Sequence, residues 1–177
     1  MAASTVPPDY ARFIRDVPDF PKPGVMFKDI SPLLGDAAAF AAVITDLAEA
    51  ASTLRVTKVV GIEARGFLFG APLAIALGVG FVPIRKPGKL PSQVERLDYA
   101  LEYGTDAVEV HCDGVKAGER VVIVDDVLAT GGTAVAASQL LDRVGAAVAG
   151  CLFVIELGFL GGRARMATSV TSLITYP

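Results

Sequence analysis

The sequence is poor in the residues that build metal centres and disulfide frameworks. It has no tryptophan, one histidine and two cysteines among 177 residues. The histidine, His111, and the cysteines, Cys112 and Cys151, cannot supply the four ligands of a structural zinc site. Two cysteines in a chain without a secretion signal are expected to be reduced thiols. We therefore expect no zinc site and no disulfide, and a structural or surface role for His111.

Long hydrophobic runs and a strong excess of one charge are also missing. No segment approaches the roughly 18–20 uninterrupted apolar residues of a membrane span, because Arg65, Lys86 and Asp125 interrupt the most apolar regions. The N-terminal residues lack a basic start followed by an apolar stretch, so no signal peptide is expected. The formal net charge of −3 gives no general attraction to nucleic acid or acidic membranes. These absences predict a cytoplasmic protein of one domain, residues 1–177, with no nucleic-acid or membrane partner.

Apolar residues, by contrast, make up 53% of the chain and recur in an alternating strand and helix pattern. Asp36 is the expected N-cap of the first helix, and Pro72 leaves the start of the second helix open. Segments 98–103 and 107–111 read as a hairpin. The pattern predicts helices at 36–51, 67–77 and 133–144, strands at 57–62, 80–85, 119–125, 148–157 and 169–176, and an exposed basic loop at 85–91. Strands alternating with helices predict an α/β fold with a mainly parallel central sheet flanked by helices.

Residues 121–133, VVIVDDVLATGGT, combine a buried strand, two adjacent carboxylates and a loop of small residues before a helix. Ligands bind at the carboxyl ends of parallel strands, where Asp125 and Asp126 are expected. Backbone N–H groups of a glycine loop and a helix N-terminus bind phosphate, and threonine hydroxyls can donate to it. Two carboxylates can accept hydrogen bonds from a vicinal diol, with a divalent cation relieving their repulsion. The pattern therefore predicts a ribose 5-phosphate site, with phosphate at Ala129, Thr130, Gly131, Gly132 and Thr133; the alternative is a turn with two solvated acids.

This motif is not a Walker A loop or a Rossmann fingerprint, because neither GxxxxGK[ST] nor GxGxxG occurs in it. It resembles the phosphoribosyl diphosphate (PRPP) motif of type I phosphoribosyltransferases. Further segments resemble the adenine-specific branch of that family: FPKPGVMFKDISPLL (20–34), GIEARGFLFGAPLA (61–74), RKPGKLP (85–91) and LEYG (101–104). The resemblance implies the family fold, with a small hood at about 1–34 and a flexible loop and hairpin at about 85–111. It also implies transfer from PRPP to adenine, giving AMP and pyrophosphate in purine salvage.

For PRPP, the resemblance implies that Asp125 and Asp126 hold the ribose hydroxyls directly or through Mg²⁺. Arg65 is implied at the pyrophosphate, whereas position alone would also allow a surface arginine. The resemblance implies that the basic loop closes over the diphosphate and that a homodimer can supply a basic residue from the neighbouring subunit. Its candidate pyrophosphate ligands are Arg85, Lys86 and Lys89, which as a charge run could equally form a solvated face.

For the base, the resemblance implies that Phe27 stacks on adenine while backbone groups of Met26 and Lys28 read its edge. Leu157 is implied beneath the base. Core packing is the alternative for Phe27, and lysine at position 28 departs from the arginine of many relatives. Glu102 is implied as a general acid/base at N7 of adenine, although alone it would read as a surface glutamate, and Tyr103 is implied over the closed site.

Two other functions remain open from sequence. One is a phosphoribosyltransferase for hypoxanthine, guanine or orotate, against which the segment FPKPGVMFKDI (20–30) argues. The other is a non-catalytic PRPP sensor that controls transcription. A sensor should carry a DNA-binding domain and a basic face, and neither is evident in this sequence.

Overall fold

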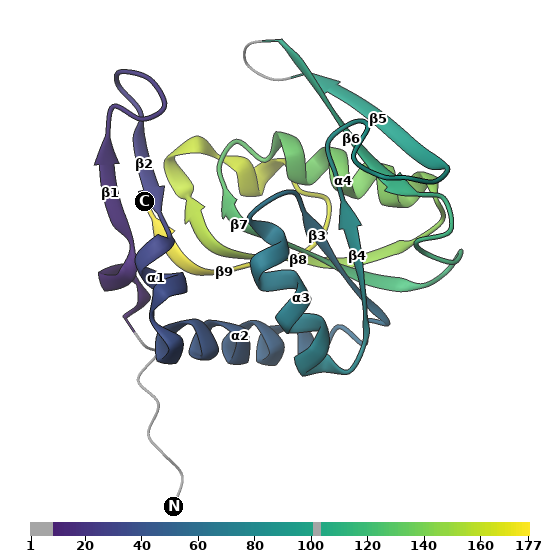
Figure 1. Ribbon diagram of the computed structural model, residues 1–177, viewed down its shortest axis with the longest axis horizontal. Coiled ribbons are helices and arrows are strands. Elements are labelled where there is room, and N and C mark those ends of the chain that lie inside the picture. The colour runs from purple at the N-terminus through teal and green to yellow at the C-terminus, as the bar shows by residue number, and fades with distance from the viewer. Residues whose placement is uncertain (1–8, 101–103) are drawn as a thin grey trace, which may run out of the picture.

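The computed structural model describes residues 9–100 and 104–177 and has a five-stranded parallel sheet at its centre (Figure 1). The order across the sheet is β4-β3-β7-β8-β9. The strands are β3 (Lys58–Ile62), β4 (Gly80–Ile84), β7 (Arg120–Leu128), β8 (Ala147–Leu157) and β9 (Val170–Tyr176). Each neighbouring pair is parallel, as the alternation of strands and helices predicts.

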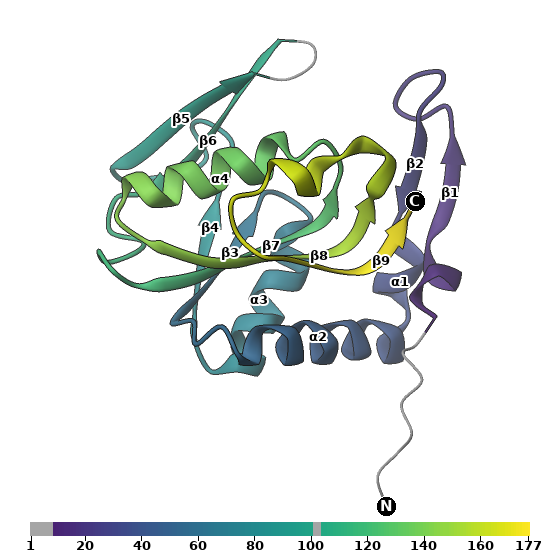
Figure 2. The same ribbon diagram turned by 180° about the vertical axis from the view of Figure 1, so that it is seen from behind.

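Helices cover both faces of this sheet. Helices α2 (Ala37–Ser52) and α3 (Gly66–Leu77) lie on one face and α4 (Gly132–Arg143) on the other (Figure 2). Alternate residues of β7 explain the two layers, since Val122 and Val124 pack with α2 and α3 while Val121 and Ile123 pack with α4. A strand buried on both faces reads as the continuous apolar run seen in the sequence.

Residues at the helix ends explain where α2 begins and where α3 stops. The side chain of Asp36 accepts a hydrogen bond from the backbone N–H of Ala39 at 2.9 Å, so it is the N-cap of α2. Helix α3 ends at Gly78, whose φ of 67° is left-handed. Pro72 lies inside α3 and does not mark its start.

Two antiparallel pairs stand away from the central sheet. β1 (Arg15–Pro18) pairs with β2 (Met26–Asp29) beside the end of β9, next to the short helices η1 (Tyr10–Phe13) and α1 (Ser31–Gly35) (Figure 1). β5 (Val94–Ala100) and β6 (Thr105–His111) form a hairpin that packs on α4. Strand β6 begins at Thr105, before the start of the expected segment 107–111. Glu102 and Tyr103 lie outside the described residues.

The end of β7 differs from the sequence expectation. The strand was expected to finish at Asp125, but it continues to Leu128 and pairs with β8 as far as Leu128 and Glu156. The two aspartates are therefore part of the strand itself. The strand tolerates them because Asp125 accepts a backbone hydrogen bond, because Asp126 forms an ion pair, and because the segment faces an open cavity.

Candidate active site

A cavity of about 410 Å³ opens where β7, β8, β2 and the start of α4 meet. Its walls come from segments far apart in the sequence. It brings together the sequence-predicted residues Met26, Phe27, Lys28, Arg65, Asp125, Asp126, Ala129, Thr130, Gly131, Gly132, Thr133 and Leu157. It also includes residues that the sequence had not singled out: Val25, Val127, Leu128, Ala134, Phe153 and Leu160.

The two aspartates, Asp126 buried and Asp125 half-buried, form a charge-rich floor to this cavity. Asp126 is 3% exposed, and the Oδ1 atom of Asp125 accepts a hydrogen bond from the backbone N–H of Asp126 at 2.9 Å. Burial, followed by the charge of Asp126, raises the pKa of Asp125 well above its usual value. Burial also raises the pKa of Asp126, although the positive charge of Arg65 opposes the change. Two adjacent carboxylates with one neighbouring cation leave surplus negative charge that a bound cation or hydroxyl groups would relieve.

Arg65 ends the turn between β3 and α3 and faces that carboxylate pair. Its Nε atom lies 2.7 Å from Oδ2 of Asp126, and its guanidinium carbon lies 5.2 Å from the centroid of the Phe27 ring. The Arg65 side chain is still 42% exposed. It therefore partners a buried acid while keeping donors available to a ligand in the cavity.

The loop from Ala129 to Thr133 has the geometry of an anion site. Gly131 adopts a φ of 79°, and α4 begins at the following residue, so backbone N–H groups at the helix N-terminus lie beside the cavity. Gly131 is the N-cap, and it makes no side-chain cap hydrogen bond to that N-terminus. An anion in the cavity would meet both unsatisfied N–H groups and the positive end of the helix dipole.

A second glycine segment, which was not predicted from the sequence, supports this loop. A side chain at Gly162 would place its Cβ 2.2 Å from the carbonyl oxygen of Ala129, and one at Gly131 would lie 2.9 Å from the carbonyl oxygen of Gly162. Arg165 donates from Nη1 to the carbonyl oxygen of Thr130 at 2.8 Å. The signal was present as GFLGGRAR (158–165), a glycine and arginine run directly after a buried strand.

The hood supplies the apolar wall. Phe27 is half-buried, packs edge-to-face against Phe20 with centroids 5.0 Å apart, and lines the cavity rather than the core. The Lys28 ammonium lies 2.6 Å from Oδ1 of Asp16 and 3.9 Å from the centroid of the Tyr176 ring. The side chain of Lys28 thus ties β2 to β1 and β9.

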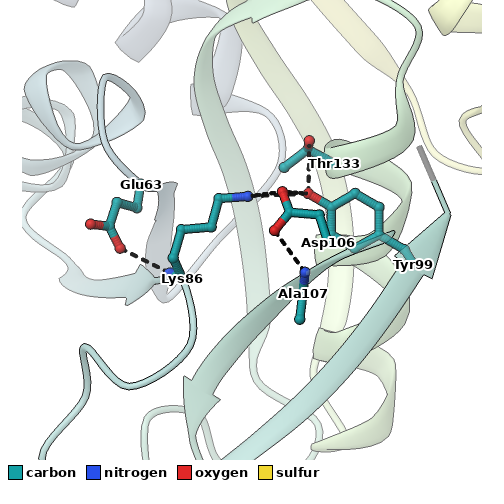
Figure 3. A network of polar contacts seen from close by, with 6 residues as sticks. All are labelled: Glu63, Lys86, Tyr99, Asp106, Ala107 and Thr133. Carbon is teal, nitrogen blue, oxygen red and sulfur yellow. Dashed lines mark hydrogen bonds and ion pairs between the residues drawn. The ribbon is translucent and has the colours of Figure 1, made fainter. Parts of the chain in front are cut away.

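The basic loop lies outside the cavity wall. Arg85 donates to both carboxylate oxygens of Glu63, at 3.0 and 3.1 Å, and this lowers the pKa of Glu63. The Lys86 ammonium forms an ion pair with Asp106 (Figure 3). Lys89 does not line the cavity either; its carbonyl oxygen accepts from Arg85 at 3.0 Å. These three cations therefore do not line the cavity, and their contact with pyrophosphate stays a prediction.

Metal ligands are scarce around the cavity. Within residues 9–100 and 104–177 no group of three or more His, Cys, Asp or Glu side chains could hold a metal ion. His111, in β6, has a buried Nε2 atom with no hydrogen-bond partner in the described part of the chain and does not line the cavity. A divalent cation at Asp125 and Asp126 would need ligands from a substrate.

Comparisons with known proteins agree with this geometry. A family model described as "phosphoribosyl transferase domain" matches residues 33–169. The adenine phosphoribosyltransferase of Streptomyces coelicolor is 60% identical over 153 residues, covering 86% of this chain and 84% of the relative. A crystal structure of adenine phosphoribosyltransferase from Thermoanaerobacter pseudethanolicus superposes with a TM-score of 0.92 at 52% identity, covering 94% and 97% of the two chains. The Saccharomyces cerevisiae enzyme, solved with an imino-altritol bisphosphate and adenine, has a TM-score of 0.87 at 41% identity, with coverages of 92% and 95%.

In the described part of the chain, no helix has the length and apolar character needed to cross a membrane.

Proposed function

The chain belongs to the phosphoribosyltransferase family and converts adenine and PRPP into AMP and pyrophosphate, and we propose which of its residues carry each part of that reaction. The observation that supports the proposal most is the adjacent pair Asp125 and Asp126 beside the glycine loop before α4, since both line one cavity. A diol site next to a phosphate site matches the ribose 5-phosphate half of PRPP.

The 5-phosphate binds at Ala129–Thr133, and the ribose hydroxyls donate to Asp125 and Asp126. Positive charge develops on the ribose ring as pyrophosphate leaves, and two fixed carboxylates close to the ring stabilise that charge. Because their pKa values are raised, Asp125 and Asp126 gain most from hydroxyl donors or a cation. Mg²⁺ fits this donor set when substrate oxygens complete its shell, and it would supply charge neutralisation for the diphosphate.

Arg65 binds the departing pyrophosphate, because it lines the cavity beside Asp126 and its side chain is 42% exposed. Arg85, Lys86 and Lys89 reach pyrophosphate only after the basic loop moves or across a subunit boundary. A homodimer is supported by Leu68 and Ile75, apolar residues that are 43% and 83% exposed on the outer face of α3.

Adenine lies between Phe27 and Leu157, with the backbone of Met26 and Lys28 at its edge. Glu102 acts as general acid/base at N7, and Tyr103 covers the site. The hood (about 1–34) and the loop and hairpin (about 85–111) of one domain then enclose the reactants, which excludes water and suppresses PRPP hydrolysis. A cytoplasmic location is consistent with the free thiols Cys112 and Cys151.

The direct test is pyrophosphate release from PRPP and Mg²⁺ with adenine, hypoxanthine, guanine, uracil and orotate in parallel. We expect release with adenine alone, together with AMP, and none after chelation of Mg²⁺. Release with another base instead would reassign the base site. PRPP binding without release with any base would favour a PRPP sensor over an enzyme.

A further inference from the structure

A polar network links the hairpin to the phosphate loop (Figure 3). The hydroxyl of Tyr99, in β5, lies 3.1 Å from Oδ2 of Asp106 and 3.2 Å from Oγ1 of Thr133. The Lys86 ammonium contacts the same Asp106 oxygen and lies 3.3 Å from the Tyr99 hydroxyl. The backbone N–H of Ala107 donates to the other oxygen of Asp106 at 2.8 Å.

The charge states of Asp106 and Lys86 in this network are well defined. Burial alone would raise the pKa of Asp106, but hydrogen bonds from Lys86, Ala107 and Tyr99 outweigh it and hold that pKa below its usual value. Burial, the largest single effect, would likewise lower the pKa of Lys86, but the interactions with Asp106 and Tyr99 together outweigh it, so the net pKa is raised. At neutral pH Asp106 is therefore a carboxylate that only accepts, and Lys86 is an ammonium that only donates.

The Tyr99 hydroxyl carries one hydrogen and has two acceptors within reach. When it donates to Asp106, the hydrogen bond between the two hydroxyls is kept only if Thr133 donates to Tyr99, and Thr133 then presents only lone pairs to the cavity. When it donates to Thr133, the hydrogen of Thr133 is free to point into the cavity. Rotation of two hydroxyl groups interconverts these arrangements, with no movement of the other atoms.

We propose that Tyr99 is a positioning residue for the 5-phosphate, whose hydroxyl donates to Thr133 and directs the Thr133 hydrogen onto a phosphate oxygen. This inference rests on the proposed phosphate site at Ala129–Thr133. A phosphate dianion is a stronger acceptor than a phenol, so it draws the Thr133 hydrogen and selects this arrangement. Asp106 gives up one donor in the change but keeps Lys86 and Ala107, so the cost is small.

The test is ribose 5-phosphate and pyrophosphate binding by calorimetry, with PRPP kinetics, for Tyr99→Phe and the parent protein. We expect the Kd of ribose 5-phosphate and the KM of PRPP to rise about fivefold to tenfold. The Kd of pyrophosphate and kcat should change less than about twofold, since the lost hydroxyl serves only the 5-phosphate. Tyr10→Phe, which removes a phenol hydroxyl bonded to Asp46 outside the cavity, is the matched control.

A double-mutant cycle separates positioning from a general structural effect. In Thr133→Val the hydroxyl to be oriented is gone, so adding Tyr99→Phe should cost nothing more; in Thr133→Ser the full Tyr99→Phe effect should persist. Asp106→Asn, which weakens the competing acceptor for the Tyr99 hydrogen, should tighten ribose 5-phosphate binding about twofold.

Three results would overturn the inference. One is an equal loss from Tyr99→Phe with and without the Thr133 hydroxyl, and another is weaker ribose 5-phosphate binding in Asp106→Asn. The third is unchanged ribose 5-phosphate binding in Tyr99→Phe while Thr133→Val weakens it, which would leave the phosphate site intact. Unchanged binding in Thr133→Val would instead remove the phosphate site of the proposed function, and this inference with it.

Discussion

The Nε atom of Arg65, at the start of α3, lies 2.7 Å from the buried Oδ2 atom of Asp126 in β7. One strand thus holds the proposed ribose ligands, and the turn after the neighbouring strand supplies their only ion-pair partner among the described residues. The pair lies on the boundary between the proposed ribose and pyrophosphate sites. Loss of either member should affect both sites.

Arg65→Gln should lower kcat/KM for PRPP by about 10²–10³, because it removes a preorganised donor to the leaving group. The pKa of Asp126 should rise further once the opposing charge of Arg65 is gone, so the acidic limb of the PRPP-binding pH profile should move to higher pH. Steady-state kinetics across pH measure both effects. Arg120→Gln, at the opposite end of β7, is the control and should match the parent. An unshifted limb would contradict the electrostatic coupling.

Asp125→Asn should stabilise the free protein while weakening PRPP binding. A raised pKa means that the folded protein holds this proton more tightly than the unfolded chain does, for which the pKa is about 3.9. The stability contribution is therefore complete below that value and is lost as the pH rises through the folded pKa. At neutral pH we expect a gain of about 1 kcal/mol, or roughly 2–4 °C in Tm. Thermal unfolding at pH 4 and pH 7.5 measures it, and the gain should shrink at pH 4.

Asp125→Asn combined with Asp126→Asn should abolish most PRPP affinity, since neither amide carries the charge that attracts the diol and its cation. Isothermal titration with PRPP and Mg²⁺ measures the change. Unchanged affinity would disprove the ribose-diol assignment.

Gly162→Ala should disturb the phosphate loop, although residue 162 does not line the cavity. The new Cβ would lie 2.2 Å from the carbonyl oxygen of Ala129, so the backbone of the loop must shift. We expect the KM of PRPP to rise more than about tenfold, as misplaced ligand groups cost large factors in rate. Gly35→Ala, where a Cβ meets no atom within 4 Å, is the control. Equal KM values for the two variants would show that the Gly131 and Gly162 contact is not needed.

Lys28→Met should raise the KM of adenine about threefold to fivefold and leave the KM of PRPP unchanged, because the ammonium anchors the hood to Asp16 and Tyr176. Asp16→Asn should act in the same direction. Lys28→Arg should restore the parent value, since a guanidinium can make both contacts. Loss of adenine binding in Lys28→Arg would point instead to a direct side-chain contact with the base.

Glu102→Ala should lower kcat by about 10²–10⁴ with little change in the KM of PRPP, as expected for a general acid/base. Glu95→Ala, on β5 of the same hairpin, controls for loss of hairpin charge. Equal changes in kcat and KM would count against a chemical role.

Local patterns predicted most of the fold. The cap at Asp36, the left-handed Gly78 and the apolar runs of β7 and β8 depend on near neighbours, and they define the elements to within a few residues. The predicted end of β7, at Asp125, was wrong because acidic residues normally end a buried strand. Here Arg65, distant in sequence, and the open cavity allow the strand to continue.

The sequence by itself determined which groups are candidates for binding PRPP and adenine, namely the adjacent carboxylates, the glycine loop and the segment FPKPGVMFKDI (20–30). Tertiary structure alone decided how those groups are supported. The Gly162 contact with the phosphate loop, the Lys28 anchor on Tyr176 and the Tyr99 contact with Thr133 each join segments that no local pattern relates. These contacts form because the folded chain is closely packed, which brings the backbones and side chains within van der Waals or hydrogen-bond distance. Hydrophobic periodicity in the sequence carries no information about such contacts.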